Sequence, residues 1–145
     1  MSEANEQPDV CMSVHLCSDD VPRSVRFYTE TLGFRCVAKY PEQGEPVWAH
    51  LSLAGQDVMV ASPMSEGSGD GAWAEFHADN TRAFHAEPSG GVLVYLRVPD
   101  IDAFHAEITA RGATTAGEPV TQFYGIRDLP LRDPDGHRLV FYSSL

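Results

Sequence analysis

The feature that most constrains the fold of this 145-residue chain is a pattern of elements that occurs twice. Asp20 and Asp100, eighty positions apart, each follow a strand-like segment and stand where a helix N-cap is expected. Leu51 and Leu131 occupy corresponding strand positions at the same spacing. An element order that recurs at one fixed spacing indicates an internal duplication. We therefore expect two similar modules within one structural domain, which suits the chain length.

In the first module, residues 12–63, apolar side chains alternate along residues 12–17, as in a half-buried strand. Asp20 then begins a helix with Tyr28 on its apolar face, and Gly33 ends it where positive φ is needed. The remaining strands of this module are predicted at residues 34–40, 47–53 and 57–62.

The second module, residues 92–145, has the same β-α-β-β-β order. A strand at residues 92–98 precedes a helix that Asp100 caps and Gly112 stops. Ile101, Phe104 and Ile108 form the apolar face of that helix, and strands are predicted within residues 113–121, at 125–132 and at 139–143.

Two segments lie outside these modules. Residues 1–11 are polar and acidic, and we expect a flexible arm. Residues 64–91 are rich in Gly, Ser and acidic side chains, without a clean period over most of their length. This composition predicts a long connecting loop with room for a short helix.

Charge and hydropathy exclude several classes of partner. A net charge of -11 disfavours nucleic acid and anionic lipid, since their binding depends on neutralisation of phosphate by Lys and Arg. It mildly favours a cationic ligand. The chain has no run of eighteen apolar residues for a membrane span and no signal-peptide pattern, so we expect a cytoplasmic protein.

The stretch RDPDGHRLVF, residues 132–141, brings together three potential metal ligands, Asp133, Asp135 and His137. Its proline and glycine instead favour a turn, with aspartate side chains that accept from the turn amides. A calcium loop would need a closing Glu where Ser144 stands. We therefore interpret the motif as a turn between two strands, with His137 just past it at the sheet rim.

Two stretches carry a family resemblance. DDVPRSVRFYTETLGF, residues 19–34, resembles the first helix of the vicinal oxygen chelate superfamily, and TQFYGIRDLPLRDPDGHRLVF, residues 121–141, resembles its C-terminal end. That superfamily comprises glyoxalase I, extradiol dioxygenases, fosfomycin-resistance enzymes and bleomycin-resistance proteins. The resemblance implies an α+β fold in which tandem β-α-β-β-β modules form curved four-stranded sheets around a cavity, with helices on the outer faces.

Metal-dependent members of this superfamily carry ligands at set strand positions. The resemblance places those positions at Ser13, Val60, Leu93 and Val140, none of which ligates a metal well. We therefore expect no metal, no cofactor and no catalytic residue of the usual family kind. His15 and His50 remain open as a nonstandard metal pair, and His15 with Cys17 as a thiolate pair.

Strand alternation separates side chains that pack on the helices from those that line the cavity. The side chains predicted to pack on the helices are those of Val14, Leu16, Leu51, Leu53, Leu139 and Phe141. The cavity side then takes Ser13, His15, Cys17, Trp48, His50, Ser52, Val58, Val60, Leu93, Tyr95, Arg97 and Tyr142, with Phe123 and Tyr124 at the rim.

Among these residues, aromatic and polar side chains predict a ligand site. Aromatic rings on a concave face suit flat or cationic molecules through stacking and cation–π contacts. The alternative is a closed barrel that the rings merely fill, but His15, His50 and Arg97 would be costly in a dry core. The predicted ligand-binding residues are His15, Trp48, His50, Tyr95, Arg97, Phe123, Tyr124 and Tyr142.

Within the superfamily, the C-terminal stretch is most similar to the metal-free bleomycin-resistance-like group, whose pattern is QPWG-R…RDPxGN. Tyr124 stands where that group often has Trp, and one extra residue precedes the turn. The resemblance implies a homodimer that sequesters a cationic or aromatic small molecule, as antibiotic-resistance proteins do, in crevices lined by both subunits. A metal-dependent lyase, isomerase or dioxygenase with nonstandard ligands, and a metabolite-binding accessory domain, remain as alternatives.

Overall fold

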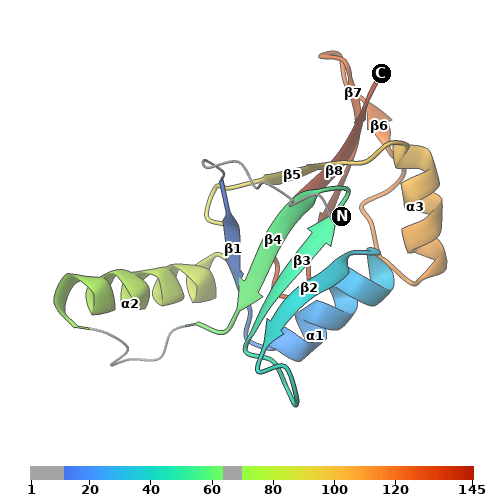
Figure 1. Ribbon diagram of the computed structural model, residues 1–145. Coiled ribbons are helices and arrows are strands. Elements are labelled where there is room, and N and C mark those ends of the chain that lie inside the picture. Colours follow the sequence, from blue (N-terminus) through green and yellow to red (C-terminus); the bar gives the residue numbers. More distant parts are fainter. Residues whose placement is uncertain (1–11, 64–69) are drawn as a thin grey trace, which may run out of the picture.

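The computed structural model describes residues 12–63 and 70–145. It confirms the α+β fold and the duplicated order of elements (Figure 1). The first half consists of β1 (Val14–Cys17), α1 (Val21–Arg26), η1 (Phe27–Thr31), β2 (Arg35–Tyr40), β3 (Trp48–Leu53) and β4 (Gln56–Ala61). After α2 (Gly71–Ala86), the second half consists of β5 (Val94–Arg97), α3 (Ile101–Ala110), β6 (Val120–Thr121), β7 (Ile126–Arg132) and β8 (Arg138–Ser144).

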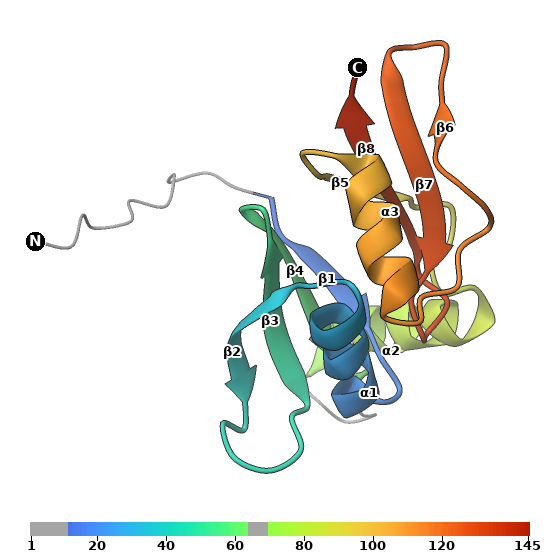
Figure 2. The same ribbon diagram turned by 90° about the vertical axis from the view of Figure 1, so that its right-hand side faces the viewer.

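The two halves form separate four-stranded sheets with the same topology. Their strand orders are β1-β4-β3-β2 and β5-β8-β7-β6. In each sheet the first strand pairs in parallel with the last, and the other pairs are antiparallel. The sheets lie next to one another and do not close into one barrel (Figures 1 and 2).

Both helix starts are capped as predicted. The Asp20 carboxylate accepts from the Arg23 amide at 3.1 Å, and the Asp100 carboxylate accepts from the amides of Asp102 and Ala103. These bonds satisfy amide groups that would otherwise lack partners at a helix N-terminus. Gly33, which follows the first helix, has φ +86°, a conformation that glycine adopts without strain.

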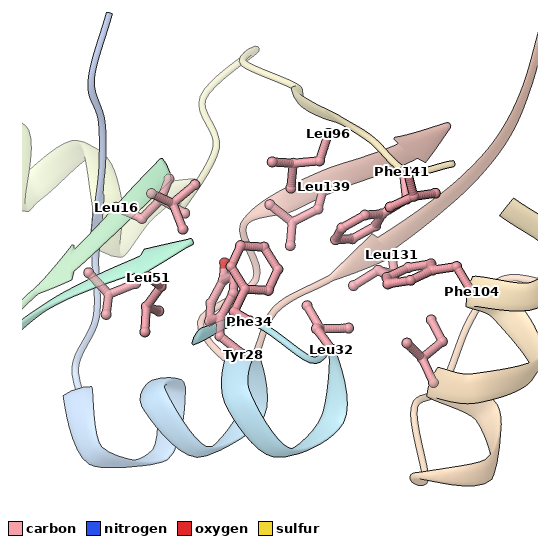
Figure 3. Close-up of a cluster of buried hydrophobic side chains, with 14 of the residues drawn as sticks. Leu16, Tyr28, Leu32, Phe34, Leu51, Leu96, Phe104, Leu131, Leu139 and Phe141 are labelled. Carbon is pink, nitrogen blue, oxygen red and sulfur yellow. The ribbon is translucent and has the colours of Figure 1, made fainter. Parts of the chain in front are cut away.

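One hydrophobic core joins the two halves. Helices α1 and α3 each cover one face of their own sheet, and both lie on the viewer's side in Figure 2. Tyr28 and Leu51 of the first half and Leu139 and Phe141 of the second are fully buried in one cluster (Figure 3). Burying each such side chain contributes about 1.5 to 3 kcal/mol. Of the predicted helix-side residues, Leu16, Leu51, Leu139 and Phe141 are confirmed as core, whereas Val14 and Leu53 are partly buried against it.

Two residues assigned to the cavity side were placed wrongly. Val58 and Val60 on β4 are each only 1% exposed and belong to the core. The reason is the register: β3 and β4 pair Leu51 with Val58, and directly opposed residues share a face of the sheet. Met59 therefore takes the place on the other face that was predicted for Val60.

The connecting segment contains a longer helix than the sequence predicts. Helix α2 has 16 residues, of which only Phe84 is buried, so it lacks the apolar stripe that would reveal it. Residues 1–11, predicted as an arm, and residues 64–69 of the predicted loop lie outside the described residues. Within residues 12–63 and 70–145, no helix is long and apolar enough to cross a membrane.

The turn of residues 133–137 lies between β7 and β8 as predicted, but its first and last residues, Asp133 and His137, are buried. His137 is 4% exposed, and its Nε2 donates to the Cys17 carbonyl oxygen at 2.6 Å. One Asp133 oxygen accepts from the amides of Asp135 and His137, and the other accepts from the Tyr28 hydroxyl at 2.8 Å. This turn therefore attaches the second half to the end of β1 and to the first helix.

The first half makes the corresponding contact with a single side chain. Gln56, at the β3–β4 turn, donates to the Arg97 carbonyl oxygen at 2.7 Å and accepts from the Arg97 amide at 2.8 Å. Arg97 ends β5 as Cys17 ends β1, eighty positions earlier. Each half thus places its turn on the last residue of the other half's first strand.

Candidate ligand-binding faces

Each sheet has a face opposite its helix, which we call the open face. On the first sheet, His15 of β1, Met59 of β4 and His50 of β3 form one row across paired strands. Trp48 belongs to the next row, opposite Ala61. Trp48 and His50 are half-buried, and His50 Nε2 lies 3.2 Å from Asp57 Oδ1. Three of the predicted ligand-binding residues therefore share this face.

His15 lies beside a groove of about 280 Å³ between β1 and α2. Burial, and secondarily the nearby His77, lowers the pKa of His15 below its usual value. In the same groove, burial raises the pKa of the Cys17 thiol, and Asn80 Nδ2 lies 3.4 Å from its sulfur. A raised pKa favours the thiol over the thiolate, so this environment does not activate Cys17 as a nucleophile.

The open face of the second sheet is aromatic. The rings of Tyr95 and Tyr142 lie 6.0 Å apart in an edge-to-face arrangement, and Tyr95 remains 46% exposed. Arg97 pairs with Tyr142 across β5 and β8. A groove of about 570 Å³ on this half is lined by residues that include Leu93, Pro130 and Val140, and by none of the predicted ligand-binding residues.

Phe123 and Tyr124 lie in the turn between β6 and β7. Their rings make edge-to-face contact at 5.0 Å, and Phe123 is 99% exposed. The pKa of Tyr124 is raised by partial desolvation and then by Asp128 and Tyr95, which lie near its hydroxyl. Tyr124 therefore lies beside the aromatic residues of the second sheet.

Asp128 is a residue of this face that the sequence analysis missed. It is 6% exposed, and its Oδ1 accepts from Gln122 Nε2 at 3.0 Å. Asp128 alternates with Leu129, which lies in the core, so its side chain points to the open face. The same alternation, applied to β7 in the sequence, would have identified it.

The predicted ligand residues thus form two groups. Within the described residues, no hydrogen bond, ion pair or ring contact between their side chains joins the two groups. The first group is His15, Trp48 and His50, and the second is Tyr95, Arg97, Phe123, Tyr124 and Tyr142.

The residues present do not fit a family metal centre. Ser13 and Leu93 offer no strong ligand, Val140 is apolar, and Val60 faces the core. Within residues 12–63 and 70–145, no three His, Cys, Asp or Glu side chains are grouped so that they could hold a metal ion. The pair His15 and His50 therefore lacks a third protein ligand in this part of the chain.

The geometry above is that of a known family. The model of the Glyoxalase/Bleomycin resistance protein/Dioxygenase superfamily matches residues 9–141. The chain therefore belongs to this superfamily, as the two motifs predicted. No curated protein sequence matches the chain significantly.

Solved structures agree with this assignment. TioX from Micromonospora sp. ML1 is 25% identical, with a TM-score of 0.68 over 94% of this chain and 97% of that one. A glyoxalase/bleomycin resistance protein/dioxygenase from Nocardioides is 20% identical, with a TM-score of 0.65 over 96% and 85%. A superfamily member from Sphaerobacter thermophilus DSM 20745 is 22% identical, with a TM-score of 0.64 over 94% and 98%. The last two matches support the fold alone.

Proposed function

We propose that this protein binds an aromatic or cationic small molecule and sequesters it without turnover. The observation that carries the proposal is the aromatic open face of the second sheet. Tyr95, Tyr124 and Phe123 are 46%, 55% and 99% exposed, although large aromatic side chains are usually buried in a folded chain. Exposed apolar surface of this kind is typical of a binding site.

Binding without turnover is favoured by the residues at the family metal positions and by the environment of Cys17. The family metal positions offer no ligand set, and the Cys17 thiol is held in its neutral form. Lewis-acid and thiolate chemistry therefore both lack their usual groups among the described residues.

A second copy of the chain completes the proposed site. One chain leaves Tyr95 exposed and Trp48 and His50 only half-buried, and no contact among the described residues joins its two groups of predicted ligand residues. In a homodimer, the first sheet of one copy would cover the second sheet of the other, so that Trp48 and Tyr95 face the same ligand. Two-fold symmetry would then create two equivalent sites.

The proposal is tested by titrating a panel of cationic and aromatic compounds, starting with a cationic glycopeptide such as bleomycin. The chain has two tryptophans, so Trp73→Phe, on the exposed part of α2, leaves Trp48 as the single reporter of fluorescence quenching. Saturable quenching that Tyr124→Ala weakens supports the proposal. If no compound in the panel binds, or if a compound is converted to product, sequestration is wrong.

A further inference from the structure

A carboxylate lies in the open face of the second sheet without a cationic partner among residues 12–63 and 70–145. Asp128 takes part in none of the ion pairs among the described residues. Its one hydrogen bond within the described part of the chain, from the Gln122 side-chain amide, comes from a neutral group. Burying a charge without an opposite charge costs free energy that a bound cation would offset.

One oxygen of this carboxylate remains accessible. Every side-chain nitrogen or oxygen that is sealed from solvent in residues 12–63 and 70–145 has a hydrogen-bond partner. Oδ1 of Asp128 bonds Gln122, whereas Oδ2 has no such partner there, so Oδ2 must retain contact with solvent. A ligand on the open face can therefore reach it.

The two nearest arginines along the strands do not neutralise Asp128. Arg127 points to the opposite face and pairs with Asp102 on α3 at 2.9 Å. Arg97 shares a row with Asp128, but Tyr142 of β8 lies between them. The backbones of β5 and β7 are two strand spacings apart, about 9.6 Å. The Arg97 side chain could reach Asp128 only by folding over Tyr142.

Tyrosine side chains lie near the same carboxylate. Tyr142 is its direct neighbour across β7 and β8, and the Tyr95 ring contacts the Tyr142 ring. Tyr124 is close enough for the charge of Asp128 to act on its hydroxyl. Tyrosine faces around a carboxylate favour an ammonium group, because both the ring quadrupole and the negative charge attract it.

The first sheet offers no such group at the equivalent position. Trp48 lies between Tyr40 and Ala61 there, as Asp128 lies between Val120 and Tyr142. An aromatic side chain thus takes the position of the carboxylate. Of the two equivalent rows, only the row on the second sheet therefore contains a carboxylate.

From these contacts we propose that Asp128 binds the protonated amine of an aromatic ligand, whose rings lie against Tyr95 and Tyr142. This inference rests on the proposed function and deepens it. It adds a residue that determines specificity and narrows the ligand class to aromatic ammonium compounds.

The test compares three probes of one shape: naphthylmethylamine, naphthylmethanol and naphthoate. Each is titrated against full-length protein labelled with fluorotyrosine, and affinities are taken from the tyrosine resonances. Tyr28, which is fully buried, serves as the internal reference for folding. The variant is Asp128→Asn, which keeps the shape of the side chain. The control is Asp79→Asn, which removes one charge from the exposed surface of α2.

We expect the wild type and Asp79→Asn to bind the amine about tenfold more tightly than the alcohol, as a charge-assisted hydrogen bond implies. Asp128→Asn should lose this preference while its affinity for the alcohol stays unchanged. Equal binding of amine and alcohol by the wild type would overturn the role of Asp128 and leave aromatic binding intact. Tightest binding of naphthoate would also overturn it. If no probe shifts Tyr95, Tyr124 or Tyr142, both this inference and the proposed function fail.

Discussion

The two halves contact each other at equivalent places and build those contacts differently. Gln56 reaches the end of β5 with one side chain whose hydrogen bonds are exposed, whereas the turn around Asp133 and His137 reaches the end of β1 as a buried network. Both bond the carbonyl oxygen of the last residue of a first strand, Cys17 or Arg97. Duplicated topology therefore does not imply duplicated energetics, because burial decides how much each contact contributes.

The largest expected effect separates these two contacts. Asp133→Ala should lower the free energy of unfolding by about 3 kcal/mol or more, because it leaves the buried Tyr28 hydroxyl and two turn amides without their acceptor. Gln56→Ala should cost about 1 kcal/mol, since its bonds are exposed and water can replace them. Urea denaturation measures both. Equal losses would mean that the two contacts are energetically alike.

A smaller effect compares the two open faces. If both contribute to one ligand site, Trp48→Ala on the first sheet and Tyr95→Ala on the second should each weaken a bound ligand about tenfold, since loss of a stacking ring costs on the order of 1.4 kcal/mol. Calorimetry with the tightest compound of the panel measures this. Loss of affinity in only one variant would confine the site to one sheet.

Mixing those two variants tests whether the faces belong to different copies. In mixed dimers of Trp48→Ala and Tyr95→Ala chains, one site has both substitutions and the other has neither. Random exchange should restore full affinity to about a quarter of all sites. No restoration after the subunits have exchanged would place both faces of a site within one chain, and light scattering that gives the mass of one chain would exclude the dimer.

The smallest expected effect concerns His15 of the first face. Its pKa in the folded state lies below the ordinary value of 6.5, because of burial first and of His77 second. The unfolded chain therefore binds the proton more readily, and the wild type should lose stability relative to His15→Gln as the pH falls through about 6.5. NMR titration should show the pKa of His15 rising towards 6.5 in His77→Gln. An unchanged pKa would contradict the role of His77.

Local signals in the sequence predicted most of the fold. The caps at Asp20 and Asp100 and the apolar faces of the two capped helices depend on residues close in the chain, and all are confirmed. The correct faces of Val58 and Val60 could also have been predicted from residues close in the chain. Counting across the two-residue turn at Ala54 and Gly55 pairs Leu51 with Val58, which fixes the face.

Other features depend on contacts between distant residues, which periodicity does not encode. His137 bonds Cys17, 120 positions earlier, so a turn motif alone could not reveal that it is buried. Helix α2 is fixed by contacts such as the stacking of Phe84 on His137, rather than by an apolar stripe of its own. Strand alternation put His15, Trp48, His50, Tyr95 and Tyr142 on the faces opposite the helices, where they lie, and their part in ligand binding stays a prediction. Their division between two sheets followed only from the tertiary arrangement.

Strand alternation also has a consequence for how such a protein can diverge. Leu129 and Asp128 are neighbours in the chain, yet one packs in the common core and the other lies on the open face. Selection on ligand preference can therefore change every second residue while the intervening ones preserve the fold. After duplication, the residues at two equivalent positions could diverge, as Trp48 and Asp128 have done. A single ancestral sheet could in this way give rise to a two-faced site whose sides recognise different parts of one molecule.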